Sequence, residues 1–271
     1  MNEKILKALL RLFALVSEAN KSAEIRNKRE IVSDHLHHQL DNELAEKYLE
    51  YYDQRVDYYH PESLSPEHDV IHGKTLDERL DIFCDQLNEE LEREQKILII
   101  INLLDFISAD KQISPFEIVF VDKTAKRLLI DEAEYHDIKQ YSLSAIDKIK
   151  NKANLLFIDA YGDDSYPLQK HIRIDNLDGR IIVLYVKSSN TFVVRYFGND
   201  QLTLQGQHLK KGRTYIWSLG GVIHNPKVGS IYYTWVSGKF IQETTKVRTV
   251  FNAFDIEYSY GSGPNGIKPF T

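Results

Sequence analysis

The sequence predicts an α+β protein of several domains, in which an all-helical bundle is followed by an all-β sandwich. Two patterns predict this. In residues 1–150 apolar residues recur every three or four positions, which is typical of helices that bury one face. From Leu155 onward the apolar segments become short, rich in β-branched and aromatic residues, and separated by turn residues. The 271 residues suit about two domains. We expect the chain to divide into residues 1–150, 151–250 and 251–271.

The two halves also differ in charge. Residues 1–150 contain 20 Lys and Arg against 31 Asp and Glu, a net charge of about −11, whereas residues 151–271 contain 14 against 9, about +5. Opposite charges predict that the halves dock on each other. Neither charge is large enough to indicate a nucleic-acid partner. No apolar run approaches the roughly 20 residues of a membrane span, so we expect no direct membrane insertion of this chain.

Start signals delimit the helices of the acidic half. Helical spacing predicts helices over residues 5–16 and 22–40 and a third from Asp41, followed by a loop over residues 60–74. Residues 97–107 fit a buried strand by their β-branching, but their length and helical neighbours favour a buried helix. About six or seven helices are therefore expected. Three of them begin with capping patterns, Thr75-Leu76-Asp77-Glu78, Ser114-Pro115-Phe116-Glu117 and Asp131-Glu132-Ala133-Glu134.

The segments "LLRLFALVSEANKS…REIVSDHLHHQL" and "INLLDFISADKQISPFEIVFVDKTAKRLLIDEAEY" resemble the two halves of a TerB-like domain, the helical fold named for tellurite-resistance proteins. The resemblance implies a divalent metal held by an acidic residue at the end of one helix and a Glu that opens the next. The second half keeps this pair as Asp110 and Glu117. The first half has Asn20-Lys21-Ser22 where the acid is expected, with Glu30 further on. We favour the alternative that Glu117 closes a capping box with Ser114.

The strand-rich half predicts an antiparallel sandwich or barrel. Its tyrosines alternate with aliphatic residues, which favours a place in the core and on sheet faces over a base-stacking surface. The expected strands cover residues 155–159, 180–186, 191–197, 202–204, 214–219, 230–236 and 246–260.

One stretch, "LTLQGQHLKKGRTYIWSLGGVI", resembles the C-terminal part of a forkhead-associated (FHA) domain. Gln205-Gly206 stands where that family has Asn-Gly, and Gly220-Gly221 stands where it has Gly-Asp. The family recognises phosphothreonine through a Gly-Arg, a Ser-x-x-His and the Asn-Gly. The upstream segment "HIRIDNLDGRIIVLYV" has no Ser-x-x-His and no Gly-Arg in the right loop. We therefore expect an FHA-like scaffold over residues 151–250 without the phosphothreonine site.

The segment "VFNAFDIEYSYGSGPNGIKPFT" resembles the first strands of an ABC-transporter ATPase domain. In that family an aromatic residue at this place stacks on adenine, and Tyr260 holds the place here, with Tyr258 as the alternative. The order of the three resemblances is similar to bacterial proteins that fuse a cytosolic leader to an ATP-binding cassette and a membrane portion. This implies that the partners are the ATPase and membrane domains of the same polypeptide, at the cytosolic face of the inner membrane, with ATP and Mg as their cofactors.

No catalytic constellation is evident, so we expect no enzyme activity in this chain. It has no G-x-x-x-x-G-K-[ST] loop for the phosphates of ATP and no G-x-S-x-G motif. The single Cys84 lies on the apolar stripe of a predicted helix, as a buried thiol would, and suits a cytoplasmic protein. His35, His37 and His38 fit a solvated helix face better than a zinc site, which usually needs at least three protein ligands.

Two functions remain from the sequence. We favour the non-catalytic regulatory or interaction region of a membrane-associated ABC transporter ATP-binding protein. The alternative is a stand-alone cytosolic TerB-like protein that binds a divalent metal in a stress response. A Walker A motif within roughly 30 residues after Thr271 in the reading frame would favour the first function, and a stop codon would favour the second.

Overall fold

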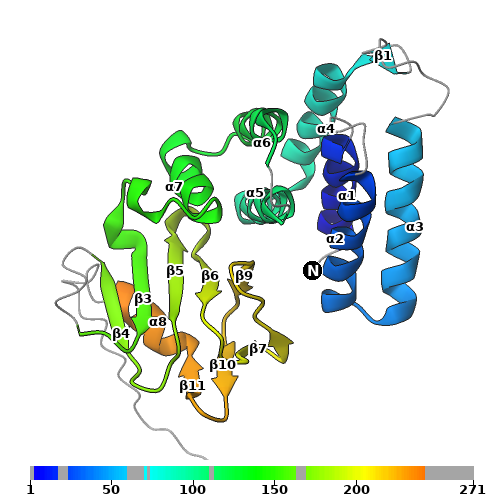
Figure 1. The fold of residues 1–271 in the computed structure, drawn as a ribbon. Helices are drawn as coiled ribbons and strands as arrows, with labels where there is room; N and C mark the ends of the chain where they lie inside the picture. The colour runs from blue at the N-terminus through cyan, green and yellow to red at the C-terminus, as the bar shows by residue number, and fades with distance from the viewer. Residues whose placement is uncertain are drawn as a thin grey trace, which may run out of the picture.

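The computed structural model of the chain has its helices in the N-terminal part and nearly all of its strands in the C-terminal part (Figure 1), which confirms the predicted α+β fold. The structure describes residues 3–17, 24–59, 70–71, 74–109, 113–162 and 169–241. Its N-terminal helices are α1 (Glu3–Ser17), α2 (Glu24–Gln39), α3 (Asn42–Tyr59), α4 (Leu76–Glu90), α5 (Arg93–Ser108), α6 (Pro115–Arg127) and α7 (Glu132–Ser142).

The helix starts follow the local sequence signals. Thr75 and Ser114 each form a capping box with the Glu three residues later, and the Asp131 carboxylate accepts a hydrogen bond from the backbone of Glu134. Residues 97–107 lie within α5 and are helical, as predicted. At the end of the expected loop over residues 60–74, two short strands pair antiparallel, β1 (Val70–Ile71) and β2 (Lys74–Thr75).

The C-terminal part contains two sheets. The larger has the strand order β4-β3-β5-β6-β9 and the smaller β11-β10-β7-β8. The strands are β3 (Leu155–Asp159), β4 (Lys170–Arg173), β5 (Arg180–Val186), β6 (Thr191–Phe197), β7 (Thr203–Leu204), β8 (Gln207–His208), β9 (Thr214–Trp217), β10 (Val222–Asn225) and β11 (Gly229–Tyr232).

Two sequence expectations need correction here. The sandwich is not fully antiparallel, because β4 runs parallel to β3 with Leu156 opposite Lys170. The expected strand over residues 230–236 is wrong beyond Tyr232, where α8 (Tyr233–Ile241) begins. Its aromatic and β-branched residues suggested a strand, but Tyr233, Val236 and Phe240 are buried at helical spacing, so tertiary packing overrides the local propensity. The strand expected over residues 246–260 lies outside the described residues.

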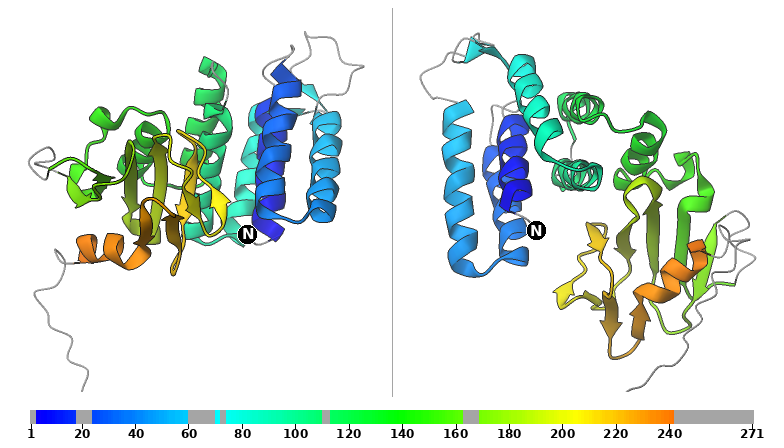
Figure 2. Two further views of the ribbon diagram at one scale, coloured as in Figure 1. Left: turned by 60° about the horizontal axis from the view of Figure 1, so that its bottom comes forward. Right: turned by 180° about the vertical axis from the view of Figure 1, so that it is seen from behind.

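The larger sheet is the middle layer of the molecule. One face, with Phe157, Ile182 and Val193, joins the apolar core of the helices. The alternate residues, such as Ile181 and Val194, face a second core formed with the smaller sheet and α8. Figures 1 and 2 show α5 between the α1–α3 group and the sheet, and α5 contacts both α1 and β9. The helical and β parts therefore share one apolar core.

Candidate functional site

A cleft lies where the helical part meets the β part, between α2, α5 and the loop that joins β8 to β9. Its volume is about 420 Å³, within the range of small-molecule sites. Apolar side chains and a set of charged and amide groups line it together. The polar lining residues include Asp34, His35, Asn102, Asp105, Gln205, Gln207, Lys210, Arg213 and Tyr215.

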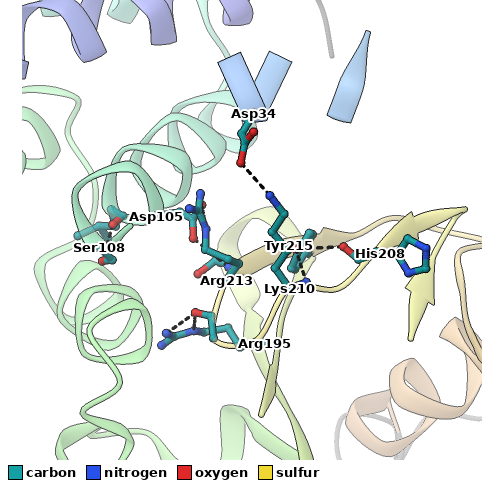
Figure 3. A network of polar contacts seen from close by, with 11 residues as sticks. Asp34, Asp105, Ser108, Arg195, His208, Lys210, Arg213 and Tyr215 are labelled. Atoms are coloured by element: carbon teal, nitrogen blue, oxygen red, sulfur yellow. Dashed lines mark hydrogen bonds and ion pairs between the residues drawn. The ribbon is translucent and has the colours of Figure 1, made fainter. Parts of the chain in front are cut away.

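Asp105 forms the inner polar contact of this cleft (Figure 3). It belongs to α5, a helix whose residues are largely buried, so its carboxylate needs partners. One carboxylate oxygen accepts from the Arg213 guanidinium at 2.6 and 3.2 Å, and the other accepts from the backbone N–H of Thr214 at 2.9 Å. The Asp105 side chain is 12% exposed and that of Arg213 is 30% exposed. Charge-assisted bonds of this kind are among the stronger hydrogen bonds in proteins.

Asp34 and Lys210 form the outer contact of the cleft. The Lys210 ammonium lies 2.8 Å from the Asp34 carboxylate, and both side chains are more than half exposed. Such exposed pairs contribute about 0–1 kcal/mol. In both contacts the helical part supplies the acid and the β part supplies the base, as the charges of the two halves predict.

Next to the cleft, a buried arginine of the larger sheet forms a hydrogen bond with α7. Arg195 on β6 donates to the backbone carbonyls of Tyr141 at 2.6 Å and Gly212 at 2.9 Å. Burial lowers the pKa of Arg195 from its usual value. The Tyr141 hydroxyl lies 2.6 Å from the carbonyl of Ile182 and 3.0 Å from that of Val193, and burial raises the pKa of Tyr141. These polar groups join the two parts inside the shared core.

The connection between α7 and β3 is also held by carboxylates of α7. It contains two 3-10 turns, Ile146–Lys148 and Lys152–Asn154. The Asp137 carboxylate accepts from the backbone N–H groups of Lys150 at 2.8 Å and Asn151 at 3.2 Å. Glu134, also on α7, contacts the end of β5 instead, where it accepts from the backbone N–H and the hydroxyl of Ser188. Local sequence patterns do not reveal these contacts, because each partner lies more than ten residues from its carboxylate.

The predicted metal ligand Glu117 lies at the start of α6 and is only 1% exposed. Its Oε2 accepts from the backbone N–H and the hydroxyl of Ser114 at 2.8 and 3.0 Å, which confirms the predicted capping box. Its Oε1 forms an ion pair with the ammonium of Lys28 on α2. Asp110, the second predicted ligand, lies outside the described residues.

The other candidate residues are packed, exposed on a helix surface as His37 is, or outside the described part of the chain. His35 contacts Phe13 edge-on with ring centroids 6.1 Å apart, and His37 Nδ1 lies 2.9 Å from the carbonyl of Ser33. Among the described residues, no group of three or more His, Cys, Asp or Glu side chains is arranged to hold a metal ion. The side chain of His38, and Tyr258 and Tyr260, are not described.

Cys84 is a buried thiol, as its position on the apolar stripe predicted. It is 1% exposed, and burial raises its pKa to about 12. A thiol of this kind is a poor nucleophile because little thiolate forms near neutral pH.

The turn between β7 and β8 brings Gln205 to the cleft. Gln205 and Gly206 both have positive φ, 53° and 84°, and occupy the two-residue turn between paired strands. Asn-Gly is the usual sequence for such a turn, since Asn tolerates positive φ better than Gln does. Gln205 is therefore a conformationally unusual residue that lines the cleft.

The comparison with protein families concerns the helical part. A family model described as tellurite resistance protein TerB matches residues 4–140, which is about half of the chain and contains α2 to α6 and most of α1 and α7. No curated protein and no solved structure gives a significant match. Within the described residues, no helix is long and apolar enough to cross a membrane.

Proposed function

Since this chain belongs to the TerB family, we propose that it is a non-catalytic regulatory and interaction region that couples a TerB domain to a β domain. The observation that supports this most is the continuity of the junction. The two parts share one apolar core, and Asp105 and Arg195 add buried or half-buried polar contacts across it. A change in the helical part would therefore reach the β part through direct contacts.

The cleft is suited to such a regulatory role because its two ion pairs differ in strength. The exposed pair of Asp34 and Lys210 contributes about 0–1 kcal/mol, so a ligand or partner can replace it at little cost. The pair of Asp105 and Arg213 is far less exposed. It would keep the helical part and the β part in contact while the outer pair is replaced. Occupation of the cleft would then shift α2 relative to the β8–β9 loop without separating the halves.

We further propose that the regulated unit is the ATP-binding cassette of a membrane-associated ABC transporter, located at the cytosolic face of the inner membrane. This rests on the resemblance of residues 250–271 to the first strands of an ABC ATPase domain, with Tyr260 as the adenine-stacking residue. The chain by itself lacks a P-loop sequence, so ATP and Mg would bind to the cassette of the whole protein. The FHA-like character of the β part is likewise a proposal, supported by two packed sheets and by the positive φ of Gln205 and Gly206.

The test has two steps. The reading frame after Thr271 should contain a Walker A motif within roughly 30 residues. In the whole protein, Asp105→Asn should then change the rate of ATP hydrolysis or its dependence on a ligand. The matched control is Asp77→Asn, which removes an exposed pair with Lys123 on the surface of the helical part. A stop codon after Thr271, or equal rates in both variants and the wild type, would contradict the proposal.

The second candidate is a stand-alone cytosolic TerB-like protein that binds a divalent metal in a stress response. Membership of the family favours it. A stop codon after Thr271, together with a metal-dependent rise in melting temperature that Glu117→Gln abolishes, would support this candidate.

A further inference from the structure

A charged pair is buried inside the helical part. Lys28 on α2 is 2% exposed and Glu117 on α6 is 1% exposed, and the two residues form an ion pair across 89 positions of sequence. The Lys28 ammonium also lies 4.9 Å from the centroid of the Phe106 ring, within the range of a cation–π contact. Burying two charges has a desolvation cost even when they are paired. The contacts with Glu117 and Phe106 therefore hold a cation at a place where it is costly to bury one.

Among the residues that the structure describes, the donor set around Glu117 does not fit a divalent metal while Lys28 is present. One carboxylate oxygen is committed to the cap of α6 through Ser114, and the other faces the ammonium. A divalent ion would need at least one of these oxygens and would be repelled by the ammonium a few ångströms away. Glu30, the acid that the sequence resemblance identifies in the first half, is exposed.

The position of the ammonium adds to this disagreement. In the TerB-like pattern each half contributes carboxylates at the end of one helix and the start of the next. In the first half, the second helix of this pattern is α2. Its Lys28 lies against Glu117, which stands at the start of α6 in the second half. A covalently attached cation thus lies against the residue that the TerB-like resemblance identifies as a metal ligand.

We propose that the Lys28 ammonium is a built-in substitute for a bound cation, which joins the two halves of the helical domain permanently and makes the domain independent of divalent metals. Removal of the ammonium would leave the Glu117 carboxylate buried with an oxygen that lacks this cation. The site would then accept a small cation from solution, either a divalent metal or an alkylammonium ion. This inference concerns the helical domain alone and does not depend on the proposed function.

The test is the melting temperature of the chain in EDTA, in millimolar Ca²⁺ or Mg²⁺, and in methylammonium. The wild type should move by less than about 1 °C between these conditions. Lys28→Ala should melt lower in EDTA and rise by about 5 °C or more with a metal ion or with methylammonium. The matched control is Arg29→Ala, which removes the next residue of α2 and its exposed pair with Asp53, and it should not respond to cations.

Further variants keep the test decisive. Lys28→Ala combined with Glu117→Gln should lose the cation response, because no carboxylate remains to bind. If Lys28→Ala does not fold in EDTA, its refolding yield with Ca²⁺, Mg²⁺ or methylammonium replaces the melting temperature, and recovery is expected. The proposal is overturned if no cation stabilises or refolds Lys28→Ala. It is equally overturned if Ca²⁺ or Mg²⁺ stabilises the wild type by several degrees and Glu117→Gln abolishes that effect.

Discussion

Replacement of Asp105 by Asn should weaken the junction between the helical and β parts. The substitution keeps the shape and one acceptor for the Thr214 N–H, but it removes the charge that faces the Arg213 guanidinium. Hydrogen bonds to charged groups contribute about 1.5–3 kcal/mol, and breaking a fully buried pair costs about 3–5 kcal/mol. Because Arg213 is 30% exposed, solvent screening reduces this cost, and we expect a loss of about 2 kcal/mol.

The free energy of unfolding can be measured in urea, which leaves the ionic strength free to vary. Trp217, buried at the end of β9 in the core between the two sheets, reports on the β part by fluorescence, and circular dichroism reports on the helices. Asp34→Asn is the matched control, since it removes the exposed pair with Lys210 on the same cleft. Its cost should stay below about 1 kcal/mol and disappear at 0.5 M salt, where the screening length is roughly 4 Å. The cost of Asp105→Asn should largely persist.

Two results would refute this reasoning. The first is a loss in free energy of unfolding for Asp105→Asn that is no larger than the loss for Asp34→Asn, or that salt removes entirely. Solvent would then screen the pair of Asp105 and Arg213 as strongly as the pair of Asp34 and Lys210. If the fluorescence and circular dichroism transitions separate in the wild type, the two parts unfold independently, and the shared core does not couple them.

Three further predictions follow from the packing of single residues. Gly198→Ala should destabilise the fold by at least about 2 kcal/mol in urea unfolding, because a Cβ would come within 2.0 Å of the carbonyl of Asp178, whereas the open Gly162→Ala should have little effect. Cys84 should resist a thiol reagent at pH 8 until the protein unfolds, since burial raises its pKa to about 12 and leaves a thiolate fraction of about one in ten thousand; rapid native labelling would contradict this. The charges of the two halves alone predict that limited proteolysis near residues 148–152 becomes faster when salt is added. The shared apolar core leads us instead to expect slow cleavage at both about 0.05 and about 0.5 M salt. Fast cleavage at either salt concentration would show that the halves are independent.

Local signals in the sequence predicted local structure well. The capping patterns at Thr75, Ser114 and Asp131 each begin a helix, because the interactions that define them lie within one turn. The same locality explains what the sequence did not reveal. The Lys28 partner of Glu117 is 89 positions away, and no spacing rule connects them.

The charge difference between the halves was informative but incomplete. It predicted docking, and the pairs at Asp34 and Asp105 have the expected polarity. It did not predict that Phe157 and Ile182 would complete the core of the helices, because strand alternation says which residues share a face and not what covers that face. The helix at Tyr233 was missed for a similar reason, since its aromatic residues suit a strand until their burial pattern is known.

Each face of the larger sheet belongs to a different core. This limits how the chain can be divided into fragments or combined with domains of other proteins. A fragment that ends with α7 would expose the apolar side of α5 and the ring of Tyr141 to solvent, and a fragment that begins with β3 would expose Phe157 and Ile182. Both fragments should aggregate on expression, since exposed apolar surface of this extent promotes association. Exchange of the helical domain for that of a relative would therefore need matched changes on the strands that cover it.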